Sequence, residues 1–231
     1  MSYLREVSRV NEAKTCTVSG CDRPRKGAYR YHCERHARAR NLYGSPIGKR
    51  IRRTAYVTER KMATHLVETN RQHPAIAEAL KLARGWRDGF KHYDLPVRHH
   101  EAWSVLSDKL VVNNVSGETL LIEMVAAFAY MMLRPNEHGL TSQEANEKFM
   151  GSALLNVVPR GKYLTESNRL RSKRVSGRVR QLVGAAALSE FGLFLSHATA
   201  QLEQQATART DRRINFTRPF SQPQKEALAH D

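Results

Sequence analysis

Acidic residues and long apolar runs are both scarce in this 231-residue sequence. Its 22 Asp and Glu residues face 38 Lys and Arg residues, which leaves a formal charge of +16 and a sequence pI near 10.2. Such an imbalance implies a polyanionic partner. The longest apolar run, Leu120 to Leu133, is too short to span a bilayer and is interrupted by Glu123. We therefore expect no membrane partner.

Other signals of function are also missing. Gly151, Gly161 and Gly177 are isolated, so the sequence lacks a glycine-rich loop that could cradle a nucleotide. It shows no internal repeat and no alternating strands of useful length. The first residues lack an apolar stretch behind basic ones, so no secretory signal is visible and we expect a cytoplasmic protein.

Cysteine is rare, and its few copies are confined to one short stretch. The sequence has three cysteines, Cys16, Cys21 and Cys33, and His36 follows the last of them. Zn²⁺ takes four nitrogen or sulfur ligands, and two close pairs separated by a spacer allow a loop to wrap it. Cys33 and His36, three residues apart, would share one face of a helix. The spacing predicts one structural Zn²⁺ held by these four residues.

The alternative is a set of three reduced core cysteines with a surface histidine. In either case no disulfide is expected, which is typical of a reducing compartment. Between the ligands, Asp22 to Pro24 has turn chemistry, residues 27–31 alternate like a short strand, and residues 33–43 form a helix candidate stopped by Gly44. This is the element order of a treble clef.

The 31 residues from Cys16 to Pro46, CTVSGCDRPRKGAYRYHCERHARARNLYGSP, resemble the small zinc fingers of bacteriophage-encoded HNH-type and other DNA-associated proteins. The shared pattern is C-x4-C, GC-R-P, C-x2-H, an arginine and a G-x-P ending. The resemblance implies zinc ligation by the four residues named above. It also implies a nucleic-acid context and a phage or mobile-element origin, without assigning a reaction.

Positive charge is concentrated at the two ends of the chain. Residues 1–60 carry a net +10, residues 61–160 are neutral and residues 161–231 carry +6. The first basic group is predicted to contact phosphates and comprises Arg23, Arg25, Lys26, Arg30, Arg35, Arg38, Arg40, Lys49, Arg50, Arg52 and Arg53. The second group precedes and enters the last long helix and comprises Arg169, Arg171, Lys173, Arg174, Arg178 and Arg180. We expect the neutral middle to hold two cationic surfaces apart.

Apart from the candidate zinc finger, amphipathic patterns predict helices almost everywhere. The fold class expected is mainly α, with helices over residues 3–13, 57–70, 73–93, 97–112, 118–133, 141–157 and 176–208. Residues 118–133 are apolar nearly all round, so they are predicted to be the central buried helix. The expected divisions are a leading helix (1–14), a zinc finger (15–46), a basic linker (47–56), a helical core domain (57–160), a basic loop with a long C-terminal helix (161–209) and a flexible tail (210–231).

These features predict a zinc-containing nucleic-acid-binding protein that acts without catalysis in regulation, recruitment or architecture, with DNA favoured by the resemblance. One alternative is an adaptor or homodimer that uses the apolar helices over residues 118–133 and 176–208. A divergent HNH-like endonuclease is the other. Its candidate residues, His99, His100, Asn113, Asn114 and His138, lack an evident strand pair to hold them, so no catalytic residue is assigned.

Overall fold

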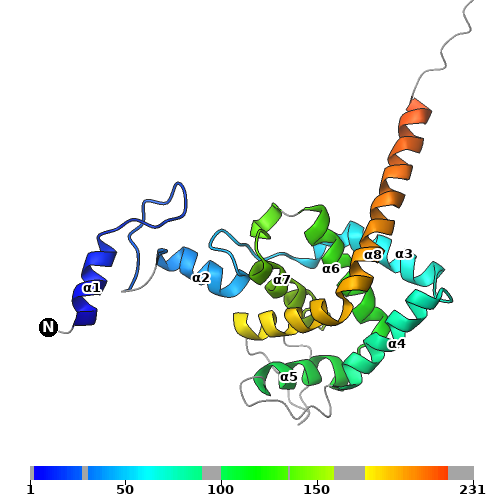
Figure 1. The fold of residues 1–231 in the computed structure, drawn as a ribbon, viewed down its shortest axis with the longest axis horizontal. Coiled ribbons are helices and arrows are strands. Elements are labelled where there is room, and N and C mark those ends of the chain that lie inside the picture. The colour runs from blue at the N-terminus through cyan, green and yellow to red at the C-terminus, as the bar shows by residue number, and fades with distance from the viewer. Residues whose placement is uncertain (1–2, 28–30, 90–99, 135, 159–174, 218–231) are drawn as a thin grey trace, which may run out of the picture.

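The computed structural model describes residues 3–27, 31–89, 100–134, 136–158 and 175–217 (Figure 1). Within these ranges the chain is mainly helical and has no strand, and its β pairing is an isolated bridge between Thr15 and Pro24. The predicted mainly α class is confirmed. The short strand expected over residues 27–31 falls largely on residues 28–30, which lie outside the described ranges.

The observed helices agree closely with the predicted ones. They are α1 (Tyr3–Glu12), α2 (Glu34–Tyr43), the 3-10 turn η1 (Arg53–Tyr56), α3 (Val57–Thr69), α4 (Pro74–Gly89), α5 (His100–Leu106), its π-helical continuation η3 (Ser107–Val112), α6 (Gly117–Leu133), the 3-10 turn η4 (Glu137–Gly139), α7 (Gln143–Leu155) and α8 (Gly177–Thr217). Figure 1 shows α3 to α7 and the first part of α8 gathered into one body, from which the rest of α8 projects, with α1 and the segment around the cysteines at one end beyond α2.

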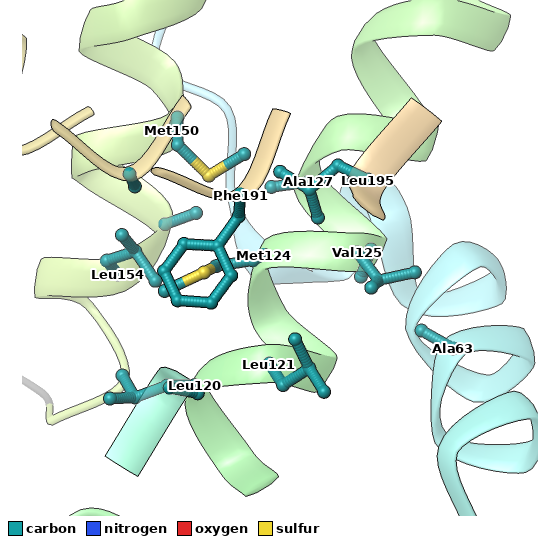
Figure 2. Packing of buried hydrophobic residues seen from close by; sticks show 14 of the residues in the cluster. Ala63, Leu120, Leu121, Met124, Val125, Ala127, Met150, Leu154, Phe191 and Leu195 are labelled. Atoms are coloured by element: carbon teal, nitrogen blue, oxygen red, sulfur yellow. The ribbon is translucent and has the colours of Figure 1, made fainter. Parts of the chain in front are cut away.

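Helix α6 is the centre of this body, as predicted. Ser116 caps it by accepting a hydrogen bond from the amide of Thr119, and most of its residues are buried. Figure 2 shows Met124 of α6, Leu154 of α7 and Phe191 of α8 within the same cluster of buried side chains. Helix α6 thus buries most of its apolar surface inside the chain, while Met132 and Leu133 near its end remain exposed.

Helices α7 and α8 touch backbone to backbone at two glycines. A Cβ atom added to Gly151 would lie 1.9 Å from the carbonyl oxygen of Arg180, and one added to Gly184 would lie 1.8 Å from that of Glu147. No side chain larger than hydrogen fits at either position. The glycines therefore set how closely the long C-terminal helix lies on the core.

Two helix ends differ from the predicted ones. Helix α8 continues to Thr217 rather than ending near Ala208, because residues 201–217 are rich in helix-forming Gln, Glu, Ala and Arg and contain no Gly or Pro. The first part of the predicted tail is thus helical, and its remainder lies outside the described residues. Helix α7 begins at Gln143 rather than at residue 141, with Ser142 as its N-cap.

Helix α8 also carries an apolar stretch that the sequence analysis overlooked. Over Gly177–Gln204 it is long and apolar enough to cross a membrane by length and composition, as judged within the described residues. About 39% of its most apolar window is buried inside the protein. Val183 and Leu195 belong to the core cluster. A core helix of a soluble protein has the same properties, so the stretch is weak support for a membrane span.

Candidate metal centre and the cationic cavity beside it

The four predicted metal ligands come together in the structure. Cys16, Cys21, Cys33 and His36 place one ligand atom each within 4.8 Å of one another. The Sγ of Cys16 lies 3.2 Å from Nδ1 of His36, and the Sγ of Cys33 lies 3.6 Å from the same nitrogen. The sulfurs of Cys21 and Cys33 are 3.9 Å apart. These residues form a Cys₃His cluster that can hold a metal ion.

The distances agree with tetrahedral coordination. Ligand atoms at metal distances of about 2.0–2.3 Å in a tetrahedron are separated by about 3.3–3.8 Å. The three measured separations lie within or next to that range. Cys16 and Cys33 are buried although this part of the chain has a very small core, which is expected when a shared ion, rather than apolar packing, holds the segment together.

Short backbone contacts position the first two cysteines. The amide of Cys16 donates to the carbonyl of Arg23, and the amide of Cys21 donates to the carbonyl of Val18 across a turn at Gly20. Gly20 has a φ of 72°, a left-handed conformation that glycine adopts without strain. The segment therefore folds back on itself and points both thiols inward.

The thiols of the first pair differ in acidity. Burial opposes ionisation of Cys16, but backbone amides of Cys33 and Val18 and the ring of His36 bond to its sulfur and lower its pKa to about 6. The pKa of Cys21 is raised. The amide of Arg23 opposes this increase, while burial and the neighbouring thiols of Cys33 and Cys16 produce it. Amide donors two residues after each cysteine are suited to stabilising a bound thiolate.

Helix α2 connects this cluster to the helical body. Cys33 precedes the helix and His36 lies in its first turn, while its C-terminal end meets the start of α7 and of α8. A Cβ at Gly44 would lie 2.5 Å from the amide nitrogen of Ala145, and one at Gly177 would lie 1.9 Å from the carbonyl oxygen of Asn41. The carbonyl-rich end of one helix thus faces the amide-rich ends of two others, an arrangement favoured by their dipoles.

A buried lysine strengthens this junction. The ammonium of Lys148, on α7, donates to the carbonyl of Arg40 at the end of α2 and to the carboxylate of Glu144. Lys148 was not among the predicted site residues, because a Glu and a Lys four residues apart on a helix are usually a solvent-exposed pair. In the structure it ties the helix that carries His36 to the core.

A cavity of about 730 Å³, here called the cationic cavity, opens between α2, the linker over residues 49–53, α7 and the start of α8. Among the described residues, no acidic side chain lines it. Its cationic lining residues are Arg35, Arg38, Lys49, Arg50, Arg52, Arg53, Lys148 and Arg180. A second cavity of about 740 Å³ lies along the cysteine segment and shares Arg35 and Lys49 with the first.

Five of these side chains, called the cavity cations below, are exposed and pair with no carboxylate among the described residues. They are Arg35, Arg38, Lys49, Arg50 and Arg52. Two further cationic residues of the lining pair with carboxylates: Arg53 binds the buried Glu123, and Lys148 binds Glu144. Arg180 comes from the second predicted basic group. The cavity therefore joins parts of the two groups that the sequence analysis expected to be held apart.

The remaining predicted basic residues lie elsewhere. Arg23 is exposed and lines the second cavity, Arg25 donates to the carbonyl of Thr15, and Lys26 pairs with Glu34. Arg40 and Arg178 are exposed and line neither cavity. Arg30, Arg169, Arg171, Lys173 and Arg174 lie outside the described residues.

The described residues contain no strand pair that could form the ββα unit of an HNH enzyme. Asn113 donates to the carbonyl of Asp108 at the end of η3, and His138 lies at the edge of the cationic cavity. His99 lies outside the described ranges. The candidate nuclease residues are thus not assembled into one site in this part of the chain.

Comparisons of the chain with protein-family models, with curated proteins and with solved structures find no match in any of the three.

Proposed function

We propose that this protein binds nucleic acid through the cationic cavity and that one Zn²⁺ holds its Cys/His segment in shape. In this proposal it acts without catalysis, in the regulation, recruitment or architecture of a nucleoprotein complex in the cytoplasm. DNA is favoured over RNA, and a phage or mobile-element origin is included, on the resemblance of residues 16–46 to phage-associated zinc fingers.

The observation that carries the proposal is that five cations line one cavity and that, within the described part of the chain, they pair with no carboxylate and no acidic residue lines the cavity with them. Like charges brought together repel one another and oppose folding. A polyanion removes that repulsion and releases its own counterions when it binds. Nucleic acid is such a polyanion. Its phosphates are spaced along the strand, so several of them can neutralise several cavity cations at once.

The donor set supports zinc as the metal. Three thiolates and one imidazole in tetrahedral arrangement suit Zn²⁺, a borderline-soft ion without redox chemistry. Four protein ligands leave no open coordination position. The proposed role of the ion is therefore structural: it fixes the start of α2, and through α2 the positions of Arg35 and Arg38.

The proposal is tested by fluorescence anisotropy with labelled duplex DNA, single-stranded DNA and RNA over a salt series. If the cavity cations contact phosphates, the logarithm of affinity for duplex DNA falls against the logarithm of salt with a slope of about −0.9 per contact, or about −0.7 for single strands. The variant Arg50→Gln/Arg52→Gln should weaken binding and flatten the slope by up to about two contacts.

The matched control is Lys61→Gln/Lys81→Gln, which removes the same charge from exposed positions on α3 and α4 and should bind almost as the unaltered protein does. An affinity that does not change with salt, or an equal loss of affinity in both double variants, would contradict the proposal. In that case the adaptor alternative gains support, and the mass of the protein in solution would be the next measurement.

A further inference from the structure

We infer that the cationic cavity receives a single-stranded segment of nucleic acid, with its bases against the cavity floor and its phosphates on the rim. This inference rests on the proposed function and specifies the form of nucleic acid that the site takes. It is argued from the apolar floor, the aromatic ring beside it and the size of the cavity.

The apolar residues that line the cavity, called the floor here, are buried or half-buried, whereas the five cavity cations, called the rim, are exposed. The apolar side chains include Leu42 of α2, Ile51 of the linker, Leu140 directly after η4, Phe149 of α7 and Val175 two residues before α8. Apolar surface of this kind is stabilised when a ligand covers it with apolar or aromatic groups. Phosphates alone cover only the rim. A ligand that carries both negative charge and flat apolar rings complements the whole lining.

Unpaired nucleobases supply those rings, whereas a duplex keeps its bases stacked inside. A duplex can place a base on the floor only by unpairing it, which costs a few kcal/mol. It otherwise presents only its sugar-phosphate surface, and the floor stays uncovered. A single strand has its bases free to enter, which makes it the better ligand for a cavity that is cationic at the rim and apolar at the base.

Tyr43 is the aromatic side chain placed to stack on such a base. It ends α2, lines the cavity and is half-buried. Its neighbours on the lining include Arg38, Lys49 and Arg50. Proteins that bind single strands commonly combine an aromatic platform with flanking cations, since every base has a face that can stack.

The size and charge of the cavity distinguish a strand from a free nucleotide. A volume of about 730 Å³ is in the range of clefts that hold small ligands. The five cavity cations, however, exceed the charge of one mononucleotide and extend from α2 to the linker. A strand of several nucleotides satisfies them with successive phosphates while one or two bases occupy the floor.

The experiment compares a labelled 12-nucleotide single-stranded DNA, the matching duplex and an unlabelled mononucleotide as competitor, using the full chain with its metal bound. We expect the single strand to bind at least about tenfold more tightly than the duplex, because the duplex must unpair to fill the floor. Tyr43→Leu should weaken single-strand binding by about fivefold or more, the loss expected for one stacked base, and leave duplex binding unchanged. The mononucleotide should compete only weakly.

A single strand carrying 5-iodouracil adds a readout of position, since irradiation should link it to the peptide that contains Tyr43. Tyr31→Leu is the matched control, because Tyr31 is an exposed tyrosine that lines neither cavity. Circular dichroism and bound-metal content show whether either variant has lost its fold.

The outcomes separate this inference from the proposed function. If the duplex binds as tightly as the single strand and Tyr43→Leu has no effect, the protein binds nucleic acid but the inference is wrong. Effective competition by the mononucleotide also overturns it, in favour of a nucleotide-binding pocket. If none of the three ligands binds and the RNA of the salt series does not bind either, both the inference and the proposed function fail.

Discussion

Arg53 donates two hydrogen bonds to the buried carboxylate of Glu123, with Nη2 2.5 Å from Oε2 and Nε 3.2 Å from Oε1. Tyr56 donates a third bond to the same carboxylate at 2.5 Å, and Glu123 is only 1% exposed. This pair attaches the basic linker to the central helix α6. Arg53, the last cation of the linker, is therefore a structural residue, whereas its neighbour Arg52 is exposed at the cavity.

Neighbouring arginines should thus respond differently to the same substitution. Arg53→Gln leaves the Glu123 carboxylate with too few donors and should lower the free energy of unfolding by about 1–3 kcal/mol, measured by urea titration. Arg52→Gln should change it by less than about 0.5 kcal/mol while lowering affinity for nucleic acid. Equal stability of the two variants would contradict the structural role assigned to Arg53.

Removal of a metal ligand should release the ion. Purified protein should contain one zinc per chain, and Cys33→Ser should lose it and unfold at lower temperature, because metal binding contributes directly to the stability of such segments. His32→Gln is the control, since His32 adjoins Cys33 but bonds to Thr17 instead of facing the cluster. Metal content is measured by atomic emission. Retention of zinc by Cys33→Ser, or its loss from His32→Gln, would mean that the ligand set is wrong.

Metal loss should also weaken binding at the cavity. Helix α2 carries His36 in its first turn and Arg35 and Arg38 on the cavity wall, so release of the ion frees the start of the helix that positions two cavity cations. Chelation of the bound metal should lower single-strand affinity, and added Zn²⁺ should restore it. Unchanged affinity in metal-free protein would show that the cluster and the cavity act independently.

Glycine substitutions on α8 should have opposite effects at two positions. Gly184→Ala places a methyl group 1.8 Å from the carbonyl oxygen of Glu147 and should destabilise the protein by about 1–3 kcal/mol through overpacking. Gly192→Ala on the same helix meets nothing within 4 Å and should stabilise the protein by about 0.5–1 kcal/mol through higher helix propensity. Urea midpoints of the two variants check this. Stabilisation of the protein by both substitutions would show that α7 and α8 lie further apart than the structure places them.

Two buried tyrosines should make the protein less stable in alkali. Burial, followed by the Glu123 carboxylate, raises the pKa of Tyr56 far above its usual value. Burial, followed by Glu137, raises the pKa of Tyr130 to about 12. The neutral phenols are favoured in the folded state, so this contribution is complete below pH 10, where unfolded tyrosine titrates, and is lost as the pH rises above 10.

Each such tyrosine should therefore lower the free energy of unfolding by up to about 1.4 kcal/mol per pH unit above pH 10. Urea titrations at pH 9, 10 and 11 measure the slope, and absorbance at 295 nm follows ionisation of the phenols. Tyr56→Phe should show a shallower slope than the unaltered protein. An identical slope would mean that Tyr56 ionises in the folded state as readily as in the unfolded one.

Much of the secondary structure was predictable from local pattern. The apolar content of residues 118–133, the capping Ser116 and the breaks at Gly44 and Asn113 all act over one or two helical turns, and the corresponding helix ends agree closely with prediction. Prediction was less successful at the start of α7, where two capping side chains, Thr141 and Ser142, adjoin in the sequence and Ser142 caps the helix.

Such local patterns did not predict which charged residues are buried. Lys109 donates to the carbonyls of Leu155 and Val158 at the end of α7, and Lys148 donates to Arg40 at the end of α2. In sequence both resemble solvent-exposed lysines, since nothing near them in the chain shows which carbonyl ends they will meet. Their partners lie 46 to 108 residues away along the chain.

The sequence by itself determined the mainly α fold, the central position of α6 and the four residues of the Cys/His cluster, because helical periodicity and metal-ligand spacing are properties of short stretches. Only the tertiary structure decided which cations remain unpaired at the cavity and available to a ligand. The packing of α2 on α7 and α8 brings Arg35 to the same cavity as Arg180, and the burial of Glu123 removes Arg53 from the set of unpaired cations. Charge counts in a sequence are additive, whereas pairing depends on which residues the fold places within a few ångströms of one another.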